Sequence, residues 1–192
     1  MTKLFYAAII AAFVNNLVLT QSFGMDSFIR NSKDIATSVR IAVSVLIVTV
    51  VSSLITWPIG RYVLDKLQIS FLSTILFLLV EAALVWFVLF VMKKISVHLY
   101  DHYKELLALV IINSAVLGII LNNVEVGYSF IRSTVFSIFG GVGFGIAMIL
   151  MAGVREKIKY NDIPGPFEGV PILLVTAGLM SIAFYGFTGL LL

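Results

Sequence analysis

The chain has 192 residues, of which 60% are hydrophobic and 12% are charged, and its mean hydropathy is +1.09. Apolar stretches of about 20 residues, the length that crosses a bilayer, recur along it; this excludes a water-soluble or nucleic-acid-binding domain and predicts an all-α membrane protein, a single integral membrane domain over residues 1–192 in contact with lipid. The net charge of +3 is modest, and the absence of cysteine excludes disulfides and any zinc or iron–sulfur site held by thiolates of this chain.

Six membrane-spanning helices are predicted in chain order. They cover residues 4–24, 39–59, 69–92, 106–121, 130–151 and 171–191. The first begins like a secretory signal, but no small-residue cleavage pattern follows it, so we expect it to be retained as a span. The longest connections are residues 25–38 and 153–170, which leaves no room for an extramembrane domain.

The first predicted helix contains unusually many polar residues and resembles the fourth. The segment "VNNLVL" (14–19) matches "INSAVL" (112–117) at three of six positions, including Asn15 with Asn113. The offset is 98 residues, so the halves, about 1–97 and 98–192, hold three helices each. Because three is odd, the second half must enter the membrane from the opposite side, which predicts two inverted three-helix repeats.

Inverted repeats often contain broken helices near the bilayer midplane. We therefore expect the first and fourth helices to be broken, and Asn15, Asn16 and Asn113 to cap or bridge the interrupted ends through their amides. Ordinary hydrogen bonding between helices is the alternative for these three residues.

A second midplane candidate is Glu81, in the middle of the third helix within "LFLLVEAALVWF". A carboxylate there costs several kcal/mol unless it is paired, protonated or in contact with water. Glu81 is either part of an ion or proton path or a neutral, hydrogen-bonded acid at a helix interface.

Positive residues indicate the orientation. The first, third and fifth loops and the adjoining helix ends carry nine of them, against four in the termini and the other loops. The nine are Arg30, Lys33, Arg40, Lys93, Lys94, Lys104, Arg155, Lys157 and Lys159. Since positive residues accumulate on the cytoplasmic side, both termini are predicted to lie outside.

Four stretches of the chain resemble the Rnf/Nqr membrane family, and within it the RnfA/NqrE type of subunit. They are residues 15–24, 113–123, 139–158 and 164–187, the last being the long motif "PGPFEGVPILLVTAGLMSIAFYGF". The resemblance covers nearly the whole chain and implies six spans in inverted repeats, in a bacterial or archaeal cytoplasmic membrane.

The resemblance also implies a function. Such subunits belong to complexes that couple electron flow between NADH and ferredoxin or quinone to the translocation of Na⁺ or H⁺. They pair with a homologous six-helix subunit of opposite orientation, of the RnfE/NqrD type, beside other redox subunits. We expect no catalytic residue in this chain alone, and its residues do not distinguish Na⁺ from H⁺ or ferredoxin from quinone.

The family usually holds a [2Fe-2S] cluster with two cysteines from each subunit of the pair, and this sequence departs from that pattern. Asp26 occupies the position of the first cysteine and Ser114 that of the second. A serine hydroxyl is a poor iron ligand, so we expect this chain to hold neither the cluster nor a metal. Divergence of a paralogue and deliberate alteration are both open explanations.

The loop over residues 153–170 faces the cytoplasm in this orientation. By the resemblance, Arg155, Glu156 and Phe167 are candidates for contact with a partner subunit, whereas a solvated connection is the alternative. For the chain as a whole, an inverted-repeat transporter of ions or small solutes and a membrane anchor without chemistry remain alternatives to the redox-complex subunit.

Overall fold

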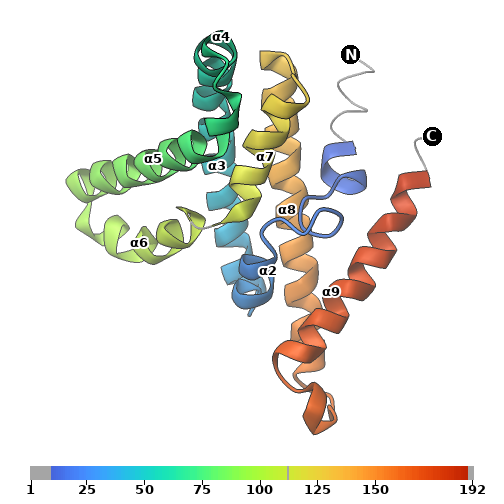
Figure 1. The fold of residues 1–192 in the computed structure, drawn as a ribbon. Coiled ribbons are helices and arrows are strands. Elements are labelled where there is room, and N and C mark those ends of the chain that lie inside the picture. Colours follow the sequence, from blue (N-terminus) through green and yellow to red (C-terminus); the bar gives the residue numbers. More distant parts are fainter. Residues whose placement is uncertain (1–9, 112, 190–192) are drawn as a thin grey trace.

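The computed structural model describes residues 10–111 and 113–189, and every regular element in that part of the chain is helical (Figure 1). Three helical stretches are long and apolar enough to cross a membrane: Ile35–Leu67, Ser70–Ile95 and Phe130–Ile158. A fourth candidate is the bent pair Tyr103–Val110 and Ser114–Glu125, whose two parts meet at 43°. The all-helical membrane class predicted from composition is therefore confirmed, and up to four of the six predicted spans meet the length criterion within the described residues.

The centre of the fold is an antiparallel pair of helices, α3 (Ile35–Ile59) and α8 (Phe130–Ile158). Glycines on α8 allow the close approach that their spacing predicts. A Cβ atom on Gly141 would lie 3.2 Å from the Cα atom of Leu46, and one on Gly145 would lie 3.1 Å from the Cβ atom of Ala42. Larger side chains at these two positions would push the helices apart.

Helix α3 is longer than predicted because both ends have local support. At its start, the Asp34 carboxylate accepts a hydrogen bond of 2.8 Å from the amide of Thr37. Near its end, Pro58 cannot donate to the helical ladder, and a wider π-helical turn, η2 (Gly60–Leu64), follows. The short α4 (Asp65–Leu67) then ends at Gln68, whose φ of 55° is left-handed.

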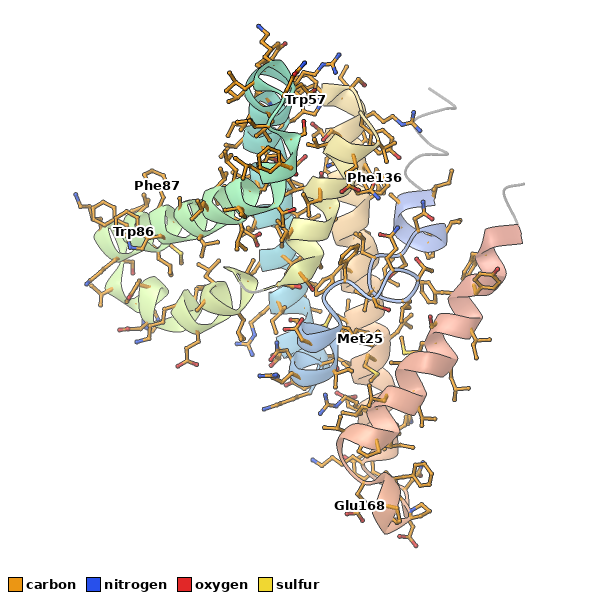
Figure 2. The ribbon with its side chains drawn as sticks, viewed as in Figure 1. Met25, Trp57, Trp86, Phe87, Phe136 and Glu168 are labelled. Atoms are coloured by element: carbon orange, nitrogen blue, oxygen red, sulfur yellow. The ribbon has the colours of Figure 1, made fainter. Side chains whose placement is uncertain are left out.

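Helices α5 (Ser73–Ile95) and α6 (Val97–Ile111) form a hairpin that projects sideways from α3 in Figure 1, after the short turn η3 (Ser70–Leu72). Only Phe77, Glu81 and Val85 of α5 are buried, one on each successive turn. Trp86 and Phe87 are exposed on the outer part of the hairpin, as Figure 2 shows. This apolar outer surface suits lipid or another membrane subunit.

The first predicted span is irregular in its described part. A π-helical turn, η1 (Ile10–Val14), is followed by turns, and then by α2 (Met25–Asn31), which lies in a segment predicted to be a connection. Residues 4–9 of this span lie outside the described residues. The helix is lost after Val14 because the chain turns to bring Gly24 against α7 (Ser114–Glu125).

The fourth predicted span, 106–121, begins earlier and ends later than expected, since α6 begins at Val97 and α7 ends at Glu125. The start of α6 carries polar residues on its exposed side, including the ion pair of 2.9 Å between Lys104 and Asp101. Hydropathy alone therefore did not reveal this part of the helix.

The sixth predicted span, 171–191, corresponds to α9 (Val170–Tyr185) and the turn η5 (Gly186–Gly189), preceded by the turn η4 (Gly165–Phe167). Pro171 lies in its first turn, where a missing amide proton costs nothing. Near its end α9 packs on the first segment, with the Phe13 and Phe184 rings stacked 6.4 Å apart. The first segment and the end of α9 are thus neighbours in space.

Candidate functional site

Asn16 holds the irregular first segment together. Its side chain is fully buried, and its Oδ1 atom accepts hydrogen bonds from the amides of Val18 and Leu19 at 3.1 and 3.2 Å. Its Nδ2 atom donates to the carbonyl oxygens of Ala12 at 3.0 Å and Gly143 at 2.9 Å. The amide thus caps the turn that follows it and bridges the segment to the middle of α8.

Asn113 performs the capping half of this role at the break between α6 and α7. Its Oδ1 atom accepts a hydrogen bond of 3.1 Å from the amide of Ala115, at the N-terminus of α7. The sequence comparison paired Asn113 with Asn15, but in hydrogen bonding Asn113 corresponds to Asn16. Asn15 is exposed and lies beside a shallow pocket next to α9.

The two interrupted segments meet at Gly24 and Ser114. The Ser114 hydroxyl accepts a hydrogen bond of 2.8 Å from the Gly24 amide. Gly24 has a φ of 74°, and a Cβ atom there would lie 2.8 Å from both the Cβ atom of Ala115 and the Oδ1 atom of Asn113. Only glycine fits both the backbone conformation and the space, so the junction depends on this residue.

Asp26, two residues after Gly24, is exposed in the first turn of α2, and Ser114 is exposed at the start of α7. The fold therefore brings together the two segments that carry the positions of the family's cysteines. These side chains do not fit a thiolate-held cluster, because they offer one carboxylate and one hydroxyl, and that hydroxyl is already hydrogen-bonded to a backbone amide. No group of three potential metal ligands occurs within the described residues.

Glu81 is fully buried on the inner side of α5, and neither of its carboxylate oxygens has a hydrogen-bond partner among the described residues. It lies between Phe77 and Val85 on the buried side of its helix. The ring of Phe77 is 3.6 Å from a Cβ position on Gly60, which places this stripe against the end of α3. The hydrogen-bonded acid considered from the sequence has no such bond here.

The three candidate partner-contact residues differ in their surroundings. Arg155 is half-buried and donates to the carbonyl oxygen of Ile29 at 2.7 Å, which ties the end of α8 to α2. Glu156 and Phe167 are exposed. Arg155 thus has a structural contact within its own chain, whereas Glu156 and Phe167 are accessible.

Sequence reasoning did not single out a second polar group in the core. Asn123 of α7 donates to the hydroxyls of Ser53 and Ser137 at 3.2 and 2.9 Å, and the Ser53 and Ser133 hydroxyls lie 3.1 Å apart. Serine is mild enough to be inconspicuous in an apolar helix. The available signal was the position of Asn123 at the end of "LGIILNN".

Comparison with known proteins adds a match over nearly the whole chain. A family model described as "Rnf-Nqr subunit, membrane protein" matches residues 4–191. The A subunit of the ion-translocating oxidoreductase complex of Pectobacterium carotovorum is 40% identical over 177 residues, 92% of each chain. That of Syntrophotalea carbinolica is 40% identical over 190 residues, 99% of this chain and 98% of the relative. The A subunit of the Na(+)-translocating ferredoxin:NAD(+) oxidoreductase complex of Acetobacterium woodii is 41% identical over 187 residues, 97% of each chain.

Proposed function

Because the chain belongs to the Rnf-Nqr family of membrane proteins, we propose that it is a subunit of the A type in an ion-translocating oxidoreductase complex. The observation that carries the proposal is the identity of about 40% to chains named as A subunits of such complexes, over almost the full length of both partners. The membrane is the bacterial or archaeal cytoplasmic membrane. The protein contributes to ion movement and assembly and is not an enzyme by itself.

Within the complex, the chain pairs with a homologous subunit of the RnfE/NqrD type and adjoins the redox subunits. Its own fold consists of two inverted repeats of three membrane segments each. Two features support the repeat: α3 and α8, each central in its half, run antiparallel, and Asn16 and Asn113 cap the breaks in the two halves. Exposed Glu156 and Phe167 are available to a cytoplasmic partner.

Both chain termini lie on the outer side of the membrane. This orientation is supported by the positive residues, of which nine lie in or beside the first, third and fifth loops. Lys33 and Arg155 lie together in a pocket beside the connection from α8 to α9, which therefore belongs to the cytoplasmic side.

Asp26 and Ser114 occupy the junction without holding a cluster, and Glu81 is the candidate for an ion path through α5. A buried carboxyl group with no partner in the described part of the chain is a feature that helices in membranes retain for ion or proton transfer. The relative from Acetobacterium woodii is named as Na⁺-translocating. Na⁺ is therefore the first ion to test for this chain.

The test is purification of the tagged chain from its native membrane, followed by identification of the bound subunits and by iron and flavin analysis. We expect a homologous six-helix subunit and flavin- or iron-containing subunits to copurify. A homodimer that transports ions or solutes without any redox partner would refute the assignment in favour of a transporter.

The junction has its own test. Asp26→Ala should leave the iron content and the electron paramagnetic resonance spectrum of the complex unchanged, with the exposed Asp162→Ala as the matched control. A cluster signal that disappears in Asp26→Ala but persists in the control would show that Asp26 ligates iron and would overturn the conclusion about the missing thiolates.

A further inference from the structure

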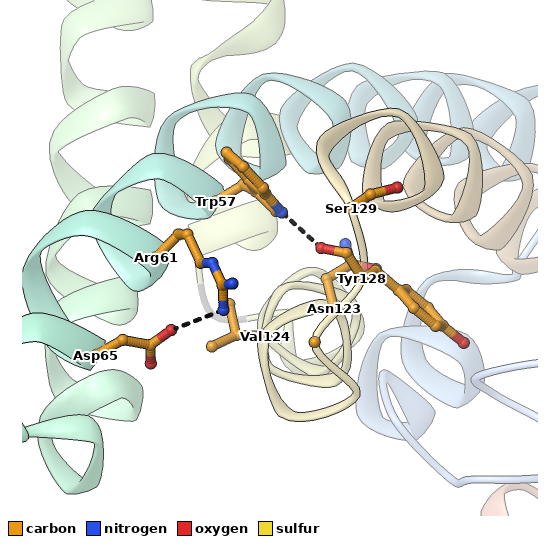
Figure 3. Close-up of a pocket in the computed structure, with 8 residues that line it drawn as sticks. Trp57, Arg61, Asp65, Asn123, Val124, Tyr128 and Ser129 are labelled. Carbon is orange, nitrogen blue, oxygen red and sulfur yellow. Dashed lines mark hydrogen bonds and ion pairs between the residues drawn. The ribbon is translucent and has the colours of Figure 1, made fainter.

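A pocket of about 380 Å³ lies where the end of α3 meets the turn between α7 and α8 (Figure 3). Its lining includes Trp57, Arg61, Asp65, Asn123, Tyr128 and Ser129. One side is fixed by the indole nitrogen of Trp57, which donates a hydrogen bond of 2.7 Å to the carbonyl oxygen of Tyr128. The pocket is at the opposite end of α3 from Asp34, and therefore on the outer side in the proposed orientation.

Asn123 is the buried part of this lining. It is only 2% exposed, and its Nδ2 atom donates to the hydroxyls of Ser53 and Ser137 and, at 3.5 Å, to the carbonyl oxygen of Ser133. Its Oδ1 atom has no hydrogen-bond partner within residues 10–111 and 113–189. Since the donors of the amide are used and its acceptor is not, the group presents a free oxygen at the pocket.

Further oxygen atoms continue from Asn123 into the protein along α3. Thr49, Ser52, Ser53 and Thr56 are all buried, with the spacing of one helical face, and span about 10 Å at 1.5 Å per residue. The hydroxyls of Thr49 and Ser52, like the Asn123 Oδ1 atom, have no partner among the described residues. Unsatisfied buried polar atoms are costly, and three of them along one path call for a ligand that oxygen atoms bind.

We propose that this pocket admits a monovalent alkali cation to a binding site formed by the Asn123 Oδ1 atom and the neighbouring oxygens. The inference deepens the proposed function and rests on it, because it assigns an outer ion-binding site to a protein proposed to take part in ion movement. The buried ligands are neutral, which disfavours Ca²⁺ and Mg²⁺, since these cations are usually held by carboxylates.

The charges at the pocket rim are compatible with a cation. Arg61 and Asp65 are 3.6 Å apart, so the guanidinium is paired with a carboxylate, and both side chains are largely exposed to solvent. Their charges cancel at the rim, and the Asp65 carboxylate is a hard oxygen ligand beside the pocket. The nearby ring of Trp57 limits the width of the opening on the other side (Figure 3).

The test measures Na⁺ binding to the purified full-length chain without redox partners. Thermal unfolding is followed in NaCl and in choline chloride at equal ionic strength, and ²³Na nuclear magnetic resonance line width reports binding directly. Saturable stabilisation by Na⁺ is expected, with the unfolding constant about 11-fold lower at a Na⁺ concentration ten times the dissociation constant. Equal behaviour in the two salts, or an effect from Ca²⁺ but not from Na⁺, would overturn the proposal.

Variants locate the site. Asn123→Ala should lose the Na⁺ effect, whereas Asn122→Ala, a change of the same type at the adjoining position, should keep it. Asn123→Asp retains the shape and adds a negative charge, so it should bind Na⁺ at least tenfold more tightly and covers the case in which Asn123→Ala does not fold. A Na⁺ effect that survives Asn123→Ala, is lost in Asn122→Ala, or is unchanged in Asn123→Asp would refute the site. Because no partner subunit is needed, failure here is distinct from failure of the copurification experiment.

Discussion

The contacts of Asn16 predict that Asn16→Ala strongly destabilises the protein. The substitution leaves the amides of Val18 and Leu19 without their acceptor, and both residues are buried. A buried donor left unsatisfied costs about 1–3 kcal/mol, and polar contacts in membranes fall toward the lower part of that range. We therefore expect a loss of about 2–4 kcal/mol in the free energy of unfolding, measured by reversible denaturation with sodium dodecyl sulfate in mixed micelles.

Asn15→Ala is the matched control, because Asn15 is adjacent and exposed and should change the free energy of unfolding by less than about 0.5 kcal/mol. Gly143→Ala provides a second arm: its Cβ atom would lie 2.6 Å from the carbonyl oxygen of Ala12, so it disrupts the same contact between η1 and α8. The double variant should therefore lose less than the sum of the single losses. Equal stability of Asn16→Ala and Asn15→Ala, or full additivity with Gly143→Ala, would refute the reasoning.

Three further predictions concern other parts of the fold. Gly24→Ala should cost about 2–4 kcal/mol through backbone strain and crowding, whereas Gly127→Ala, with a φ of 68° and open space around it, should cost only about 1–2 kcal/mol; similar losses would contradict the tight junction. Glu81→Gln should alter the ion dependence of turnover in the assembled complex, and an unchanged dependence would remove Glu81 from the ion path. Asp34→Ala should cost about 1 kcal/mol at neutral pH. Hydrogen bonds from Thr37, first from its backbone amide, hold the pKa of Asp34 below its ordinary value, so the stabilisation is present above the unfolded pKa and the difference from the variant should shrink as the pH falls through the folded pKa, measured by denaturation at several pH values.

Parts of the site were within reach of sequence reasoning. The asparagines at 15, 16 and 113 were singled out because an amide in an apolar helix needs a partner, and the structure shows Asn16 and Asn113 capping interrupted segments. The exposed position of Asn15 was not predictable, because neighbouring asparagines in a helical pattern give no indication of which one faces the core. Asn123 was missed since its partners, Ser53 and Ser137, are 70 and 14 residues away.

The amino-acid sequence by itself determined the all-helical membrane class and the family, since both depend on local composition and on the order of residues. It also determined that this chain supplies no thiolate for a cluster. Only the tertiary structure decided that Gly24 meets Ser114, that Glu81 is buried without a partner in the described residues, and that Asn123 presents a free oxygen at a pocket. These features arise from segments distant in the chain, and which groups they satisfy or leave unpaired depends on packing that periodicity does not encode.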